Sequence, residues 1–137
     1  YLVESWEPNE KLASLAETYL GSEVKRASSY ELNSMRKYDA IWASASLLHL
    51  ELECFCGALL KVRNALKPGG VFYTSFKWGI EDIQKEGRFF LMMNEDRLST
   101  CFNQVENLKI VQIKKRVDHR PDRSDEYWTE CIAIRLA

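Results

Sequence analysis

The stretch LKPGGVFY, from Leu66 to Tyr73, decides the fold that this sequence predicts. Pro68 presets the backbone angle φ for the first corner of a tight turn, and Gly69 can take the positive φ of the second corner. This turn would connect a helix to an apolar strand. A second apolar strand, 38–43 (YDAIWA), lies upstream. Strand, helix, tight turn and strand in this order predict two parallel strands joined by a crossover helix.

The spacing of apolar residues supports this arrangement. The runs 39–43 and 71–76 are nearly continuous, which is typical of strands covered on both faces of a parallel sheet. Between them, apolar side chains recur at alternating steps of three and four, which predicts a helix with one buried face. These side chains are Leu52, Phe55, Leu59, Val62 and Leu66.

Shorter elements are predicted in the first part of the chain. A strand over 1–6 precedes a helix that Asn9 caps and Gly21 ends. The apolar side chains of this helix form a stripe that we expect to be buried, and a weak strand over 23–27 follows it. The stripe consists of Leu12, Leu15, Ala16 and Tyr19.

The pattern changes in the second half of the chain. Residues 77–93 are polar without a clean period, so we expect a loop with at most one helical turn. Asn94 should cap a further helix, and 108–117 and 127–136 should be long strands that pair antiparallel. The predicted fold class is therefore α/β, a mostly parallel sheet with an antiparallel C-terminal hairpin. The length suits one domain over 1–137.

Composition argues against several classes of protein. With 19 basic and 20 acidic residues the net charge is −1, so we expect no nucleic-acid partner. There is no run of about 18 apolar residues and no signal-peptide pattern, so we expect a cytoplasmic protein without a membrane partner. The four widely spread cysteines favour reduced thiols over a disulfide framework or a metal site. They are Cys54, Cys56, Cys101 and Cys131.

Four segments, in this order and spacing, resemble class I S-adenosyl-L-methionine (SAM) dependent methyltransferases, most of all small bacterial ones of the tellurite-resistance type. The segments are 38–49 (YDAIWASASLLH), 65–70 (ALKPGG), 75–79 (SFKWG) and 87–90 (GRFF). The resemblance implies a Rossmann-like methyltransferase fold lacking its first strand, SAM as cofactor and a small-molecule methyl acceptor. Methyl transfer would be an in-line displacement, catalysed mainly by positioning.

The resemblance also implies cofactor-binding positions. Glu7 would accept hydrogen bonds from the cofactor ribose, although a carboxylate is also favourable at a helix start. Ser29 and Tyr30 would contact the adenine, unless they are ordinary loop residues. Ala43 and Ser44 end a strand where open α/β sheets bind ligands, and their small side chains would admit the methionine part of SAM. A tight packing position is the alternative for these two residues.

The acceptor would bind beyond the next strand. By the resemblance, the residues placed there are Lys77, Trp78 and Arg88. Their two cations suggest an anionic or polar acceptor. The alternative is that these charges are solvated on a loop. His49 is a candidate general base, because its ordinary pKa is close to neutrality. The alternative is that the Leu-Leu-His segment 47–49 serves as packing at the mouth of the site. Arg120 and Arg123 could close over this site from the final hairpin, or form an exposed charged loop.

The family's glycine loop, roughly G-x-G-x-G, has no counterpart among the six glycines. Either this is a truncated version of a longer methyltransferase, or it is a remnant or a domain that another chain completes. Without the central strand the sheet has unpaired edges, which would favour a homodimer. We expect weak SAM binding by residues 1–137 alone. A cofactor-less interaction module is the alternative function, and no G-x-G-x-x-G supports a nicotinamide-dependent oxidoreductase.

Overall fold

The computed structural model describes residues 1–137, which form two compact units, Tyr1–Leu32 and Asn33–Ala137. The first unit contains a helix and two short strands, and the second unit contains a four-stranded sheet with two further helices. The expectation that 1–137 acts as one domain stays a prediction.

The first unit is a short strand–helix–strand motif. Its two strands pair in parallel, and a 3-10 turn follows them. Asn9 caps the helix as predicted, since its Oδ1 accepts from the Leu12 N–H at 3.1 Å, and Gly21 ends it with φ of +65°. The elements are β1 (Ser5–Trp6), α1 (Glu10–Leu20), β2 (Val24–Lys25) and η1 (Ser29–Glu31).

The apolar stripe of α1 is not buried, so that prediction was wrong. Leu12 and Leu15 are each 54% exposed and Tyr19 is 83% exposed, whereas Ala16 is half-buried and Ala13 is the helix residue that is buried. The spacing indicates correctly which face of α1 is apolar. A sheet with two residues in each strand offers too little apolar surface to cover that face.

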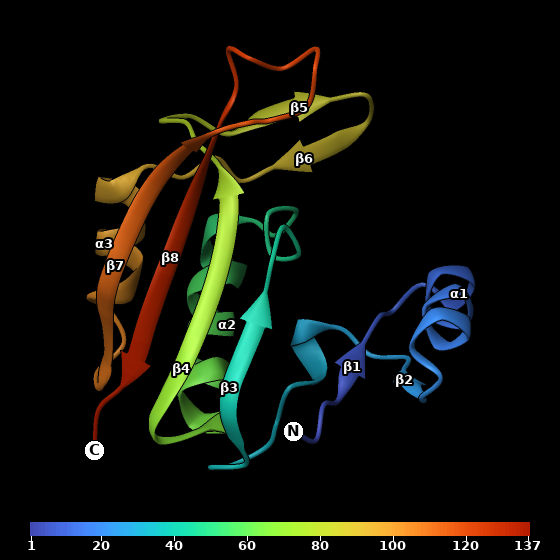
Figure 1. The fold of residues 1–137 in the computed structure, drawn as a ribbon. Coiled ribbons are helices and arrows are strands. Elements are labelled where there is room, and N and C mark those ends of the chain that lie inside the picture. The colour runs from blue at the N-terminus through green and yellow to red at the C-terminus, as the bar shows by residue number, and fades with distance from the viewer. The chain divides into compact units, whose positions relative to one another are not determined.

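The second unit contains all the elements that the Pro68–Gly69 turn predicted. Its main sheet has the order β3-β4-β8-β7, in which β3 and β4 are parallel and β8 pairs antiparallel with both β4 and β7. The fold is α/β with an antiparallel C-terminal hairpin (Figure 1). The elements are β3 (Tyr38–Ala43), α2 (Leu52–Ala65), β4 (Leu66–Lys77), β5 (Ile83–Lys85), β6 (Arg88–Phe90), α3 (Glu95–Phe102), β7 (Leu108–Val117) and β8 (Tyr127–Arg135).

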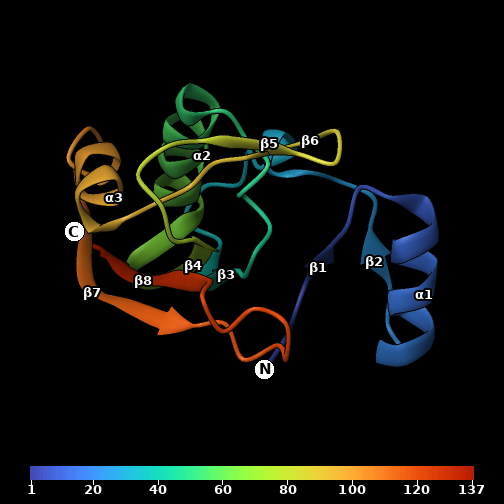
Figure 2. The ribbon, with the colours of Figure 1, turned by 90° about the horizontal axis from the view of Figure 1, so that it is seen from above.

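Both helices of the second unit lie on one face of its sheet (Figure 2). The core forms between them and the sheet, where Phe55 of α2 meets Phe76 of β4 edge to face at 5.0 Å between ring centroids. Arg135 of β8 is also buried there, and its Nη1 donates to the backbone carbonyls of Arg63, Asn64 and Leu66 at 2.7, 3.1 and 2.5 Å. Because the last carbonyls of a helix have no partner within it, Arg135 satisfies the end of α2.

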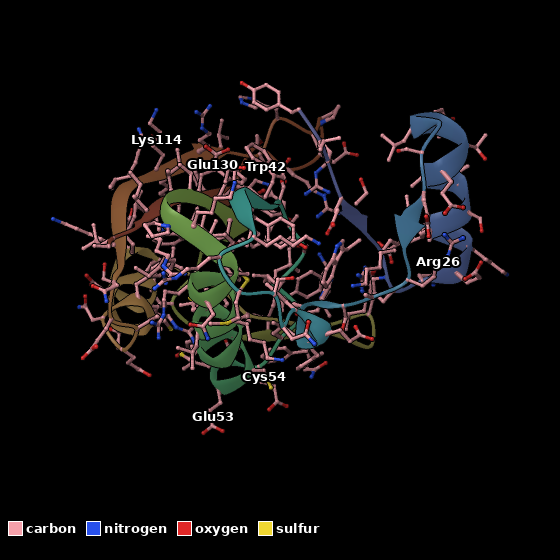
Figure 3. The ribbon with its side chains drawn as sticks, turned by 90° about the horizontal axis from the view of Figure 1, so that it is seen from below. Arg26, Trp42, Glu53, Cys54, Lys114 and Glu130 are labelled. Carbon is pink, nitrogen blue, oxygen red and sulfur yellow. The ribbon has the colours of Figure 1, made fainter.

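The other face of the sheet carries no helix of this unit. Trp42 of β3 is 74% exposed and stacks on Tyr73 of β4 at 3.9 Å between ring centroids. Figure 3 shows Trp42, Lys114 and Glu130 on the side of the sheet away from α2. The expectation that β3 is covered on both faces was therefore wrong, because a continuous apolar run does not show what covers each face.

The Pro68–Gly69 turn forms a bulge at the start of β4. Tyr38 pairs with Leu66 and Ala40 pairs with Val71, so four residues of β4 face Asp39 alone. Gly69 has the predicted positive φ, +80°. A Cβ on Gly70 would lie 2.8 Å from the Lys67 carbonyl oxygen. There is no space for a larger residue, so this position requires glycine.

Residues 77–93 form a hairpin, where a loop was predicted. β5 and β6 pair antiparallel around Glu86 and Gly87, which both have positive φ. This is the geometry of a two-residue hairpin turn, for which Asn-Gly or Asp-Gly is the usual signal. Glu-Gly is a weaker signal, and three-residue strands are too short to show an alternation of apolar and polar side chains.

No helix of the chain is long and apolar enough to cross a membrane.

Candidate active site

The carboxyl ends of β3 and β4 define the candidate site. The two strands are parallel, so both end at the same edge of the sheet, and the β5–β6 hairpin and the loop between β7 and β8 lie at this end (Figure 1). The hairpin is attached to the segment after β3, since Leu91 N–H donates to the Leu48 carbonyl at 2.7 Å. Open α/β sheets bind ligands at this edge.

The backbone bends sharply where β3 ends, just after Ala43. Ala45 has φ of +49°, and its N–H donates to the Ser75 hydroxyl at 2.9 Å. The Ser44 hydroxyl lies 3.4 Å from the same Ser75 oxygen, which is buried. These contacts hold the chain against β4, and only small side chains follow the strand. Ala43 is half-buried and Ser44 is exposed, so small side chains lie at the surface where the strand ends.

His49 is held by hydrogen bonds at both ring nitrogens. Nδ1 lies 2.7 Å from the Phe89 carbonyl oxygen, and Nε2 lies 2.7 Å from Nη2 of Arg88. A carbonyl only accepts and a guanidinium only donates, so Nδ1 carries the proton and Nε2 accepts. His49 is therefore neutral in this geometry, and its basic nitrogen orients Arg88. Leu48, beside it, is buried, whereas His49 itself is exposed.

A cavity of about 240 Å³ lies beneath the hairpin and the β7–β8 loop. Basic side chains predominate in its lining, and two aromatic rings complete it. Four separate parts of the second unit contribute the lining residues. The residues are Leu48, His49, Lys77, Lys85, Glu86, Arg88, Phe90, Arg120, Arg123 and Trp128.

Lys77 is the most enclosed cation of this cavity, with 14% of its side chain exposed. Its Nζ lies 3.4 Å from Glu126 Oε2, and Nη1 of Arg123 lies 3.3 Å from the same oxygen. Burial of Glu126 opposes its ionisation, but the charges of Lys77 and Arg123 outweigh this and lower its pKa. One carboxylate therefore serves two cations.

The β7–β8 loop is anchored at Asp118, which is buried. Arg120 forms a two-pronged ion pair with it, and Trp128 Nε1 donates to its Oδ2 at 2.9 Å. The hydrogen bonds from Arg120 are the main reason that the pKa of Asp118 lies well below its ordinary value; burial works against them. This anchor places Arg120 and Trp128 together on one wall of the cavity.

The first unit contains the other predicted cofactor residues. Glu7 directly follows β1, where its N–H donates to the Lys25 carbonyl and its Oε1 accepts from the Asn9 N–H at 2.8 Å. The second oxygen, Oε2, has no partner. Ser29 and Tyr30 lie in η1, and the Tyr30 side chain is 57% exposed. All three follow the carboxyl ends of parallel strands, as Ala43 and Ser44 do in the second unit.

The cavity brings together five of the residues named from the sequence: His49, Lys77, Arg88, Arg120 and Arg123. Trp78 is not among its lining residues; Lys115 Nζ lies over its ring at 3.5 Å from the centroid. The sequence reasoning missed Lys85, which belongs to the unpredicted hairpin. The Glu86-Gly87 turn was the signal that could have found it.

No family model and no curated protein matches this sequence. Solved structures do match. A SAM-dependent methyltransferase from Methanosarcina mazei has a TM-score of 0.79 at 14% identity, over 96% of this chain and 80% of that one. The 1,6-didemethyltoxoflavin-N1-methyltransferase of Burkholderia thailandensis, solved with S-adenosylhomocysteine, has 0.79 at 17% identity, over 98% of this chain and 61% of that one.

A third neighbour is a cyclase, SpnF, with a TM-score of 0.74 at 14% identity, over 96% of this chain and 66% of that one. The chain thus spans between 61% and 80% of the length of these neighbours. Its fold is the Rossmann-like fold of SAM-dependent methyltransferases. Identities this low establish the fold and leave the reaction to be argued from the site.

Proposed function

We propose that this protein is a SAM-dependent methyltransferase that acts on a small molecule. The observation that supports it most is the edge where β3 and β4 end, which combines the sharp bend after Ala43 with a cavity about the size of a small molecule. The methyltransferase neighbours have the same fold over nearly the whole chain.

The predicted cofactor residues suit the parts of SAM. Glu7 has a free carboxylate oxygen for the ribose hydroxyls, and the exposed ring of Tyr30 can stack on the adenine. The small side chains of Ala43 and Ser44 would let the methionine part approach the backbone. Ser29 would lie beside the adenine.

Catalysis would rest on positioning. When bound, SAM supplies an electrophilic methyl group on a sulfonium, and in-line displacement needs an aligned acceptor and little water. His49 orients Arg88 through Nε2, so it serves first as a positioning residue. It can accept a proton from the acceptor only after Arg88 leaves Nε2. A role as general base is therefore tied to movement of Arg88, for example towards a bound acceptor.

Three further features belong to this proposal. Within the class, the order and spacing of the segments 38–49, 65–70, 75–79 and 87–90 favour the small bacterial methyltransferases of the tellurite-resistance type. Residues 1–137 would act as one domain in the cytoplasm. Because none of the six glycines fits the family's glycine loop, residues 1–137 alone would bind SAM weakly. Unpaired strand edges favour a homodimer.

The test is the formation of S-adenosylhomocysteine. The protein is expressed with any residues that its gene encodes before Tyr1, and a panel of small acceptors is screened with SAM. Glu7→Gln should weaken SAM binding at least about tenfold, because hydrogen bonds to a charged group contribute about 1.5–3 kcal/mol. Glu23→Gln is the matched control, since Glu23 is exposed in the same unit.

A protein that neither binds SAM nor forms the product would contradict the proposal and favour the interaction module. SAM binding without product, whatever the acceptor, would favour another reaction on the same fold, as the cyclase neighbour illustrates. If the Glu7 and Glu23 variants bind SAM with equal affinity, Glu7 does not contact the cofactor.

A further inference from the structure

We propose that the cavity beneath the β5–β6 hairpin binds a small organic molecule through an oxyanion, a carboxylate or a phosphate monoester. That this anion is also the methyl acceptor rests on the proposed function. The binding of the anion itself does not depend on the proposed function.

The first argument is the composition of the cavity. Five basic side chains line it and Glu86 is its one acidic lining residue. The cations come from three segments that the fold brings together: the end of β4, the β5–β6 hairpin and the β7–β8 loop. They are Lys77, Lys85, Arg88, Arg120 and Arg123. Such convergence around a concave surface favours an anionic ligand, because field lines from one sign of charge are focused there.

The second argument is how these charges are matched. Arg120 is paired with Asp118, while Lys77 and Arg123 share Glu126. Lys85 and Arg88 form no ion pair with a carboxylate.

Arg88 instead donates to His49, which is neutral in this geometry. Lys77 has 14% of its side chain exposed, and it shares its one counter-charge, Glu126, with Arg123. A partly buried cation is costly unless it is paired, so an oxyanion in the cavity would compensate charges that the protein leaves unmatched.

The third argument is the shape of the donors. His49 holds Arg88 at one Nη2 proton and leaves the other N–H groups of the fork available. A guanidinium fork fits a carboxylate or a phosphate with two parallel hydrogen bonds. The rings of Phe90 and Trp128 line the same cavity and offer an apolar surface to the rest of the molecule.

A second cavity provides a natural comparison. It measures about 380 Å³, lies between α3 and β7, and has Lys109 as its one charged lining residue. It is larger, but it lacks the convergence of cations. Lys109→Gln is therefore a matched control for removal of a positive charge beside a cavity of this unit.

Binding is measured by calorimetry and by NMR shifts with three probes: benzoate, phenyl phosphate and the neutral benzamide. The protein carries any residues encoded before Tyr1. We expect one or both anions to bind, benzamide to bind at least about tenfold more weakly, and affinity to fall with salt. The anion that binds tighter identifies carboxylate or phosphate as the preferred group.

The variant Lys85→Gln with Arg88→Gln should lose at least about tenfold in anion affinity, and Lys109→Gln should not change it. Circular dichroism checks that each variant is folded, and Lys85→Gln alone is the second variant if the double one is not. Equal binding of benzamide and benzoate, no anion binding, or equal losses in the two variants would overturn the inference.

The methyl transfer assay separates this inference from the proposed function. Anion binding without product from any acceptor would contradict methyl transfer but would still support the oxyanion site. Efficient product formation from neutral acceptors, with no loss in the double variant, would support methyl transfer and refute an anionic acceptor.

Discussion

Replacing Gly70 with alanine should destabilise the second unit, because the new methyl group has no space. Its Cβ would lie 2.8 Å from the carbonyl oxygen of Lys67, 3.2 Å from that of Asp39 and 3.1 Å from Leu66 Cδ2. Two of these three atoms are backbone in the bulge that joins β3 to β4, and Leu66 is buried. Overpacking costs about 1–3 kcal/mol, and we expect the upper half of that range.

Two other glycines make the prediction specific. Gly57 is an exposed residue inside α2 with nothing within 4 Å of a new Cβ, so Gly57→Ala should stabilise by about 0.5–1 kcal/mol. Gly69 also has open space, but its φ is +80°, so Gly69→Ala should cost about 1–2 kcal/mol through backbone strain. The same chemical change should therefore give three different results.

The assay is equilibrium unfolding in urea, followed by tryptophan fluorescence and circular dichroism. Three of the four tryptophans belong to the second unit, so fluorescence mainly reports its unfolding. The slope of free energy against urea should stay constant, so a shift in midpoint measures stability directly. If Gly70→Ala is as stable as Gly57→Ala, the close approach at the bulge is refuted. A neutral Gly69→Ala would refute the strained turn.

Two more predictions concern titratable groups. Hydrogen bonds from Arg26 lower the pKa of Glu10 and Glu17 below 4.5, so these ion pairs should stabilise the first unit fully above about pH 4.5 and weaken as the pH falls through the lowered values. NMR titration should find both pKa values higher in Arg26→Gln, and unchanged values would contradict the pairing. Burial raises the pKa of the Cys101 and Cys131 thiols to about 12. Iodoacetamide near neutral pH should therefore label the more exposed thiols first, and fast labelling of either buried one would argue against this core.

Local chemistry explains which parts of the fold could be predicted. Pro68 and Gly69 determine a turn through their own backbone preferences, and Asn94 caps α3 by accepting from the Arg97 N–H at 2.9 Å. The two long strands, β7 and β8, follow from their length and the absence of a helix between them. Each of these features depends on residues that are close in the sequence.

The unpredicted features depend on residues that only the fold brings together. The exposed stripe of α1 could not be foreseen, because periodicity does not show whether a partner surface exists. The tautomer of His49 depends on Phe89 and Arg88, about 40 residues further along the chain. The sharing of Glu126 between Lys77 and Arg123 likewise needs the β7–β8 loop in place.

The position of β8 has a consequence for biosynthesis. This strand is made after β3, β4 and β7, yet it lies between β4 and β7 and pairs with both. While a ribosome is still translating residues 127–135, β4 and β7 each lack a neighbour, and the end of α2 lacks Arg135. Until the final strand inserts, the nascent chain therefore has two strands with unpaired edges, and such edges are prone to aggregation.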